Sequence, residues 1–163
     1  MPQIATDYVG TVPLVSTTTS LLMNDAAFRA YAIACSILAF KMLAAAILTA
    51  ATRTRVKQFL NPEDARTLGG AGAKEEHPDV LRMLRLHRND LENILPFFTV
   101  GLIFVLMGAS AFAAQVYFYT FTGARLVHTI TYLAKLQPWR TIAFTLGTVC
   151  MVGMLVQILI AAL

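Results

Sequence analysis

The chain has 163 residues, of which 57% are hydrophobic and only 13% are charged. Soluble globular proteins carry about 25% charged residues, so this composition excludes the usual soluble class and indicates a membrane protein. The formal net charge is +4, but the basic residues are interleaved with acidic ones and form no aromatic-basic motif, so we expect no nucleic-acid partner. The two cysteines, Cys35 and Cys150, lie in apolar segments without metal-ligand spacing, and we expect no metal site.

The first 25 residues lack the features of a cleaved signal peptide. No basic region opens the segment, Asp7 interrupts it, and no small-residue cleavage site follows an apolar stretch. We therefore expect residues 1–25 to form a separate N-terminal segment and the first membrane helix to direct insertion.

Four segments are long and apolar enough to cross a hydrocarbon core roughly 30 Å thick, which takes about 20 helical residues. They lie at about 27–52, 80–107, 112–134 and 141–163. The turns at 108–110 and 136–139 are short, and short links make antiparallel neighbours. We therefore expect an all-α fold, an integral membrane four-helix bundle that occupies residues 26–163.

The one long connection, at about 53–79, predicts the orientation of the bundle. It is rich in basic residues, namely Arg53, Arg55, Lys57, Arg66 and Lys74. Because basic loops stay on the cytoplasmic side of a membrane, this loop should be cytosolic. An even number of spans then places both termini, including the segment 1–25, on the lumenal side.

Polar side chains recur at helical spacing inside two of the four segments. Residues three or four positions apart share one face of a helix. The second segment carries one such set, made of Arg85, Arg88, Asn89 and Glu92. The third segment carries another, made of Arg125, His128 and Tyr132. Arg53 ends the first segment and Arg140 begins the fourth, so all four helices offer polar groups to one layer near the cytosolic face.

Arginines outnumber acidic residues in this layer. Ionisable groups at membrane depth are costly, and they tend to face the bundle interior or a wet cavity. A surplus of guanidinium groups favours an anionic ligand, because arginine pairs bidentately with carboxylates, and Glu92 could hold an ammonium group. The layer therefore predicts a zwitterionic, carboxylate-rich ligand that enters from the cytosol.

Simpler explanations stay open for the same residues. Helix-end arginines such as Arg53 often only extend to the lipid headgroups. The polar stripe of the second segment could be an internal salt-bridge network that fixes helix packing, and His128 could be a packing residue. Lys41, within the first segment, could reach the headgroups or pair with an acid of another subunit.

Several motifs carry a family resemblance. They are Asn61-Pro-Glu-Asp64, the block from Arg85 to Asn93, the block from Gly123 to Tyr132, and Pro138-Trp-Arg140. In this order and spacing, the chain from about Phe28 to its end resembles the family of membrane-associated proteins in eicosanoid and glutathione metabolism, known as MAPEG. Within that family it is most similar to the microsomal glutathione transferases and prostaglandin E synthases.

The resemblance implies a homotrimer in the endoplasmic reticulum membrane, with the mitochondrial outer membrane as a second location. It implies that reduced glutathione binds in clefts between subunits near the cytosolic face. The implied glutathione contacts are Arg53, Arg85, Arg88, Asn89, Glu92, His128 and Tyr132. Arg140 matches the catalytic arginine that stabilises the thiolate, and the adjacent Thr141 hydroxyl could add a hydrogen bond.

Two activities and one non-enzymatic role are consistent with these motifs. A transferase would conjugate glutathione to hydrophobic electrophiles from the bilayer and could also reduce lipid hydroperoxides. A prostaglandin E synthase would isomerise an endoperoxide, with Asp64 matching the proton-transfer group. Thr141 keeps the hydroxyl of the synthase's serine, but Phe144 stands where the synthase has tyrosine and the turn before Arg140 is one residue shorter, so we prefer the transferase. A scaffold that binds glutathione without turnover is the third alternative.

Overall fold

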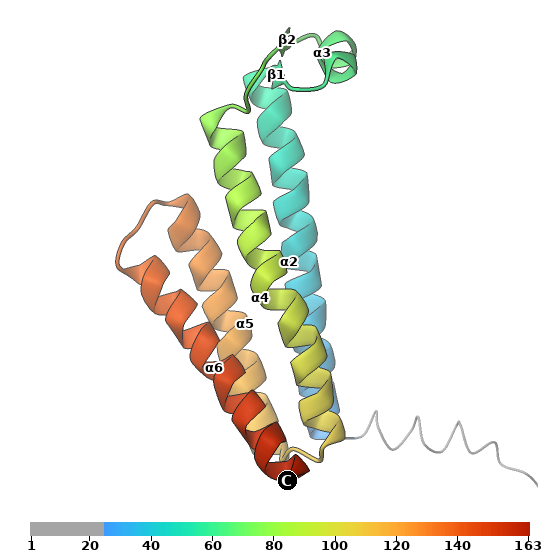
Figure 1. Cartoon of the computed structure of the whole chain (residues 1–163), viewed down its shortest axis with the longest axis vertical. Coiled ribbons are helices and arrows are strands. Elements are labelled where there is room, and N and C mark those ends of the chain that lie inside the picture. The colour runs from blue at the N-terminus through green and yellow to red at the C-terminus, as the bar shows by residue number, and fades with distance from the viewer. Residues whose placement is uncertain (1–24) are drawn as a thin grey trace, which may run out of the picture.

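The computed structural model describes residues 25–163, and most of them are helical. The long helices are Ala26–Val56 (α2), Pro78–Leu106 (α4), Ala111–Leu133 (α5) and Trp139–Ala162 (α6). Helix α2 packs against α4 and α5, and α5 packs against α6. Figure 1 shows α2 and α4 as a long pair, with α5 and α6 forming a shorter hairpin beside it. The expected all-α membrane bundle is confirmed. The predicted N-terminal segment, residues 1–25, lies outside the described residues except for Asp25.

Local sequence signals set the helix ends. The Asp25 carboxylate accepts a hydrogen bond from the Phe28 backbone N–H (2.8 Å) at the start of α2. The Ser110 hydroxyl accepts one from the Ala113 N–H (3.3 Å) at the start of α5. Such caps satisfy backbone donors that have no partner inside the helix. The link between α4 and α5 is short, since α4 ends at Leu106 and α5 begins at Ala111, as the sequence predicts.

A small lobe follows α2 and lies at the end of the α2–α4 pair (Figure 1). Its strands Gln58–Phe59 (β1) and Ala71–Gly72 (β2) pair in parallel on either side of the short helix Pro62–Leu68 (α3). A Cβ atom on Gly70 would overlap the ring of Phe59, so glycine is required at this close approach. The lobe occupies the loop that the sequence predicts to be cytosolic, and it carries Asp64.

The bundle core is aromatic on one side and built from small residues on the other. The Phe97 ring stacks on Phe121 with centroids 4.3 Å apart, and its edge meets Phe118 at 5.6 Å. Buried alanines of α2, including Ala30 and Ala34, face this aromatic cluster. Small side chains let the helix backbones approach closely, as is common between helices in membranes.

The outer surface suits a lipid environment. Large apolar side chains point outward, and Phe40 and Phe112 are 73% and 78% exposed. Helices α2, α4 and α6 are long and apolar enough to cross a membrane. Helix α5 has 23 residues but carries the polar Arg125 and His128, which are buried inside the bundle. The arrangement of four spans, with a cytosolic loop and lumenal termini, stays a prediction.

Candidate functional site

A buried ionic cluster joins three of the four long helices. Asp90 of α4 is fully buried, and it forms ion pairs with Lys41 of α2 and with Arg125 of α5. The distance from Arg125 Nη2 to Asp90 Oδ1 is 3.1 Å. Lys41 therefore pairs with an acid of its own chain. Arg125, expected to add to the cation surplus for a ligand, is instead 1% exposed and paired with a carboxylate.

Asn89 connects this cluster to an open cleft. Arg125 Nη2 donates a hydrogen bond to Asn89 Oδ1 as well as to Asp90. Because the amide oxygen already accepts this bond, the Asn89 amide nitrogen is the group that can donate to a ligand. The buried cluster thus determines the orientation of a side chain in the cleft.

The cleft has a volume of about 320 Å³ and lies between α4, α5 and α6. It gathers residues that the sequence assigned to one site although they come from three helices. Its lining consists of Asn89, His128, Tyr132, Arg140, Thr141 and Phe144. The Nδ1 atom of His128 is buried without a hydrogen-bond partner in the part of the chain that the structure describes.

Arg140 is held in the cleft by an aromatic ring. Its Cζ atom lies 5.4 Å from the centroid of the Tyr132 ring, within the range of a cation–π contact. Arg82 approaches the same ring at 5.9 Å and donates a hydrogen bond to the Tyr132 carbonyl (3.3 Å). No carboxylate within residues 25–163 forms a salt bridge with Arg140. Its charge is therefore available to an anion.

The other glutathione-contact candidates of α4 do not line the cleft of their own chain. Arg85, Arg88 and Glu92 are exposed on the outer face of α4. Arg88 Nε and Glu92 Oε1 lie 3.0 Å apart, with side chains that are 81% and 57% exposed. The stripe predicted from helical spacing is therefore divided, because Asn89 turns toward the cleft while its neighbours face outward.

Two further candidates lie near each other at the end of the bundle, Arg53 in the last turn of α2 and Asp64 in α3. Arg53 pairs with Glu76 and shares a pocket of about 70 Å³ with Asp64. Figure 1 shows this lobe at the far end of α2 and α4, beyond the turn that joins α5 to α6. Asp64 and Arg140 thus line different pockets of the chain.

Sequence reasoning missed two residues of the site. Asp90 is spaced by four from the buried Leu86 and Ile94, so it belongs to the apolar face of α4 rather than to the polar stripe. An acid on such a face signals a buried cation, because an unpaired buried charge is very costly. Gln137 of the α5–α6 turn contacts Arg140 and Thr141. The one sequence signal for these contacts was its position just before the fourth helix.

Comparison with known proteins identifies the family. The sequence model of the MAPEG family matches residues 31–160. Prostaglandin E synthase of Bos taurus is 41% identical over 138 residues, which cover 84% of this chain and 90% of that protein. The Homo sapiens prostaglandin E synthase is 40% identical over 141 residues, covering 86% and 93%. Microsomal glutathione S-transferase 1 of Sus scrofa is 43% identical over 131 residues, covering 77% and 84%. The chain therefore belongs to the MAPEG family.

Proposed function

We propose that the protein is a glutathione transferase that conjugates the thiol of reduced glutathione to hydrophobic electrophiles. The observation that carries this proposal is Arg140, a guanidinium without a carboxylate partner in the described chain, which lines the cleft beside Thr141. The relatives, a microsomal glutathione S-transferase and prostaglandin E synthases, support the same class of chemistry.

The role of Arg140 is to favour the thiolate. A free thiol has a pKa of about 8.5, and its deprotonated form is the nucleophile. A cation close to the sulfur stabilises the anion, so the proton is released to water at lower pH. The Thr141 hydroxyl donates a hydrogen bond to the same sulfur. The thiolate then forms a bond to the electrophilic carbon, and the leaving group departs with its electron pair.

The other polar groups of the cleft bind the tripeptide. Glutathione carries two carboxylates and one ammonium group, which matches the ligand expected from the arginine surplus. The Asn89 amide, His128 and Tyr132 offer hydrogen bonds from α4 and α5. The cleft volume of about 320 Å³ is near the lower end of the roughly 300–1,000 Å³ usual for small-molecule sites, so one chain supplies part of a site.

A neighbouring subunit supplies the remaining contacts in this proposal. Arg85, Arg88 and Glu92 are exposed on the outer face of α4, where a second copy of the chain can bring them to its cleft. Arg53 reaches the ligand from the last turn of α2 in the same way. As the family resemblance implies, we propose that the subunits form a homotrimer in the endoplasmic reticulum membrane.

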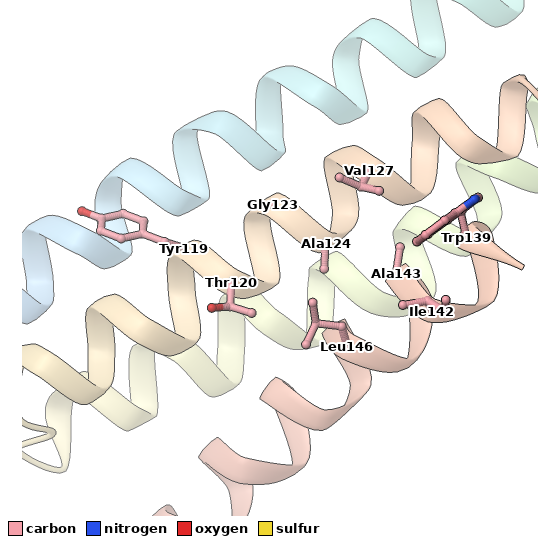
Figure 2. A pocket seen from close by; sticks show the side chains of 9 residues that line it. All are labelled: Tyr119, Thr120, Gly123, Ala124, Val127, Trp139, Ile142, Ala143 and Leu146. Atoms are coloured by element: carbon pink, nitrogen blue, oxygen red, sulfur yellow. The ribbon is translucent and has the colours of Figure 1, made fainter. Parts of the chain in front are cut away.

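Hydrophobic substrates reach the thiolate from the bilayer. Thr141 also borders an apolar pocket of about 350 Å³ along α6, shared with Ile142 and Leu146. Ile142 and Leu146 also line a second apolar pocket, between α5 and α6. Figure 2 shows this pocket with Trp139 at one end. This continuous apolar surface suits a lipophilic electrophile. A lipid hydroperoxide is a second substrate, which two glutathione molecules reduce to an alcohol and water while forming a disulfide.

A prostaglandin E synthase activity is the second candidate. Its support is the extent of similarity to the synthases, which reaches 86% of this chain. One observation favours the transferase, because the cleft contains Phe144, which has no phenol group.

Product analysis separates these functions. The full chain, purified in detergent, is given glutathione with an aryl halide, a lipid hydroperoxide or a prostaglandin endoperoxide. Turnover of the aryl halide without conversion of the endoperoxide supports the transferase, and the reverse pattern supports the synthase. Tight glutathione binding without turnover of any substrate would instead make the protein a scaffold.

A further inference from the structure

The turn between α5 and α6 carries an amide side chain that contacts both proposed catalytic groups. In the amide orientation that gives each atom a partner, Gln137 Oε1 accepts hydrogen bonds from Arg140 Nε (3.2 Å) and Nη2 (2.6 Å). In the same orientation its amide nitrogen donates to Thr141 Oγ1 (3.1 Å). Gln137 lies in the turn just before α6, whereas Arg140 and Thr141 lie in the first turn of that helix, so the turn carries the amide back to both side chains.

We propose that Gln137 is a positioning residue that holds Arg140 and Thr141 in the geometry needed to stabilise the glutathione thiolate. This inference rests on the proposed function, because it concerns the same sulfur. Gln137 touches no reacting atom itself. It acts through the two residues that do.

The contacts restrict the Arg140 guanidinium on its face and on one edge. The Tyr132 ring lies against its face with the ring centroid 5.4 Å from Cζ, and Gln137 occupies the edge formed by Nε and Nη2. The Nη1 group then remains for the ligand, because a guanidinium has five N–H donors in a fixed plane. A fixed donor contributes more to stabilising a developing anion than a mobile one, since no reorganisation is needed.

An amide suits this position better than a carboxylate. Gln137 accepts two hydrogen bonds from Arg140 as an acid would, but it adds no negative charge. A carboxylate in the same place would pair with the guanidinium and offset its attraction for the thiolate. The uncharged bridge therefore keeps the cation both fixed and effective.

The contact with Thr141 directs the threonine hydroxyl. Several threonines of these helices donate to the carbonyl four residues earlier, as Thr148 does to Phe144 (3.1 Å). Thr141 Oγ1 instead lies 3.1 Å from the Gln137 amide nitrogen and accepts its hydrogen. The hydroxyl proton of Thr141 is then free to donate to the sulfur.

Two substitutions of Gln137 test the inference on the full chain in detergent. Gln137→Glu keeps the size and adds a charge, whereas Gln137→Ala removes the contacts. The measurements are the ultraviolet absorbance of bound glutathione thiolate against pH, and glutathione affinity by equilibrium binding. Gln58→Glu, which makes the same charge change in the loop lobe, is the matched control.

We expect the Gln137→Glu thiolate to require a pH about one unit higher, a loss of about tenfold in the neutral-pH thiolate-to-thiol ratio. Gln137→Ala should give a smaller loss in the same direction, and Gln58→Glu should titrate like the wild type. Because Gln137 is exposed, the unfolding temperature should not change. If Gln137→Glu does not fold, Gln137→Met decides, and a wild-type titration in that variant overturns the inference.

The result also separates this inference from the proposed function. Wild-type thiolate titration in both Gln137 variants, with the signal lost in Arg140→Ala, removes Gln137 from the site and leaves the transferase proposal intact. If the wild-type protein itself gives no thiolate signal with glutathione, the proposed function fails, and the role of Gln137 fails with it.

Discussion

Two arginines of the bundle lie in contrasting surroundings. Arg125 is buried between helices and shares the carboxylate of Asp90 with Lys41. Arg140 lines an open cleft, where its nearest partners are the Tyr132 ring and the Gln137 amide, both uncharged. Both residues belong to the same polar layer expected from the sequence.

The difference shows how one layer can serve both packing and ligand binding. Removing one member of a buried ion pair leaves an uncompensated charge, so the Asp90 cluster ties α2, α4 and α5 together. A guanidinium that is held only by neutral groups keeps its full attraction for an anion. The following substitutions test this division, beginning with the largest expected effect.

Removal of the buried acid should have the largest effect. Asp90→Ala leaves Lys41 and Arg125 without a carboxylate, and we expect the free energy of unfolding to fall by about 3–5 kcal/mol. Thermal unfolding in detergent measures the change. Glu63→Gln, which removes an exposed carboxylate from α3, is the control and should leave the unfolding temperature unchanged. Equal stability of both variants would mean that the cluster does not hold the helices.

Removal of the cleft arginine should affect chemistry rather than stability. Arg140→Ala should lower turnover of an aryl halide by about 10²–10³-fold, the cost typical of losing one group that stabilises a developing anion. Glutathione binding should be largely retained, while the thiolate absorbance on titration with glutathione is lost. An unchanged thiolate signal would remove Arg140 from the mechanism.

Arg88 and Glu92 form an exposed ion pair on α4, in contrast to the buried Arg125 and the cleft residue Arg140. We expect Glu92→Gln to weaken glutathione affinity by about tenfold or more, because it removes a charge-assisted hydrogen bond to the ligand. Stability should change by less than about 1 kcal/mol, since exposed pairs such as Arg88 with Glu92 contribute little to folding. Equilibrium binding and thermal unfolding measure the two quantities. Failed assembly with normal binding in the surviving protein would make the pair structural.

Substitution of Asn89, which lies between the buried Asp90 cluster and the cleft, should have the smallest effect. Asn89→Ala removes one hydrogen bond to the ligand, worth about 0.5–1.5 kcal/mol, so affinity should fall by roughly twofold to tenfold. The loss of stability should be small, because Arg125 keeps its contact with Asp90. Equilibrium binding of glutathione measures the affinity. A large loss of stability would place Asn89 in the buried cluster rather than in the cleft.

Several features of the protein follow from the sequence alone because they depend on local spacing. Apolar runs of membrane length predict the helices, and capping residues predict their ends. His128 and Tyr132 are four residues apart, so one helix face places both in the cleft. Arg140 could be assigned to the site by motif, and the structure places it in the same cleft.

Only the tertiary structure decided which charges are paired and which are available. Helical spacing alone does not separate Arg125 from Arg140, since it predicts both as guanidinium groups of one polar layer. Asp90 and Arg125 are 35 positions apart in the chain, and only the packing of α4 beside α5 brings them within 3.1 Å. Pairing depends on the distance between atoms of different helices, which local periodicity does not specify.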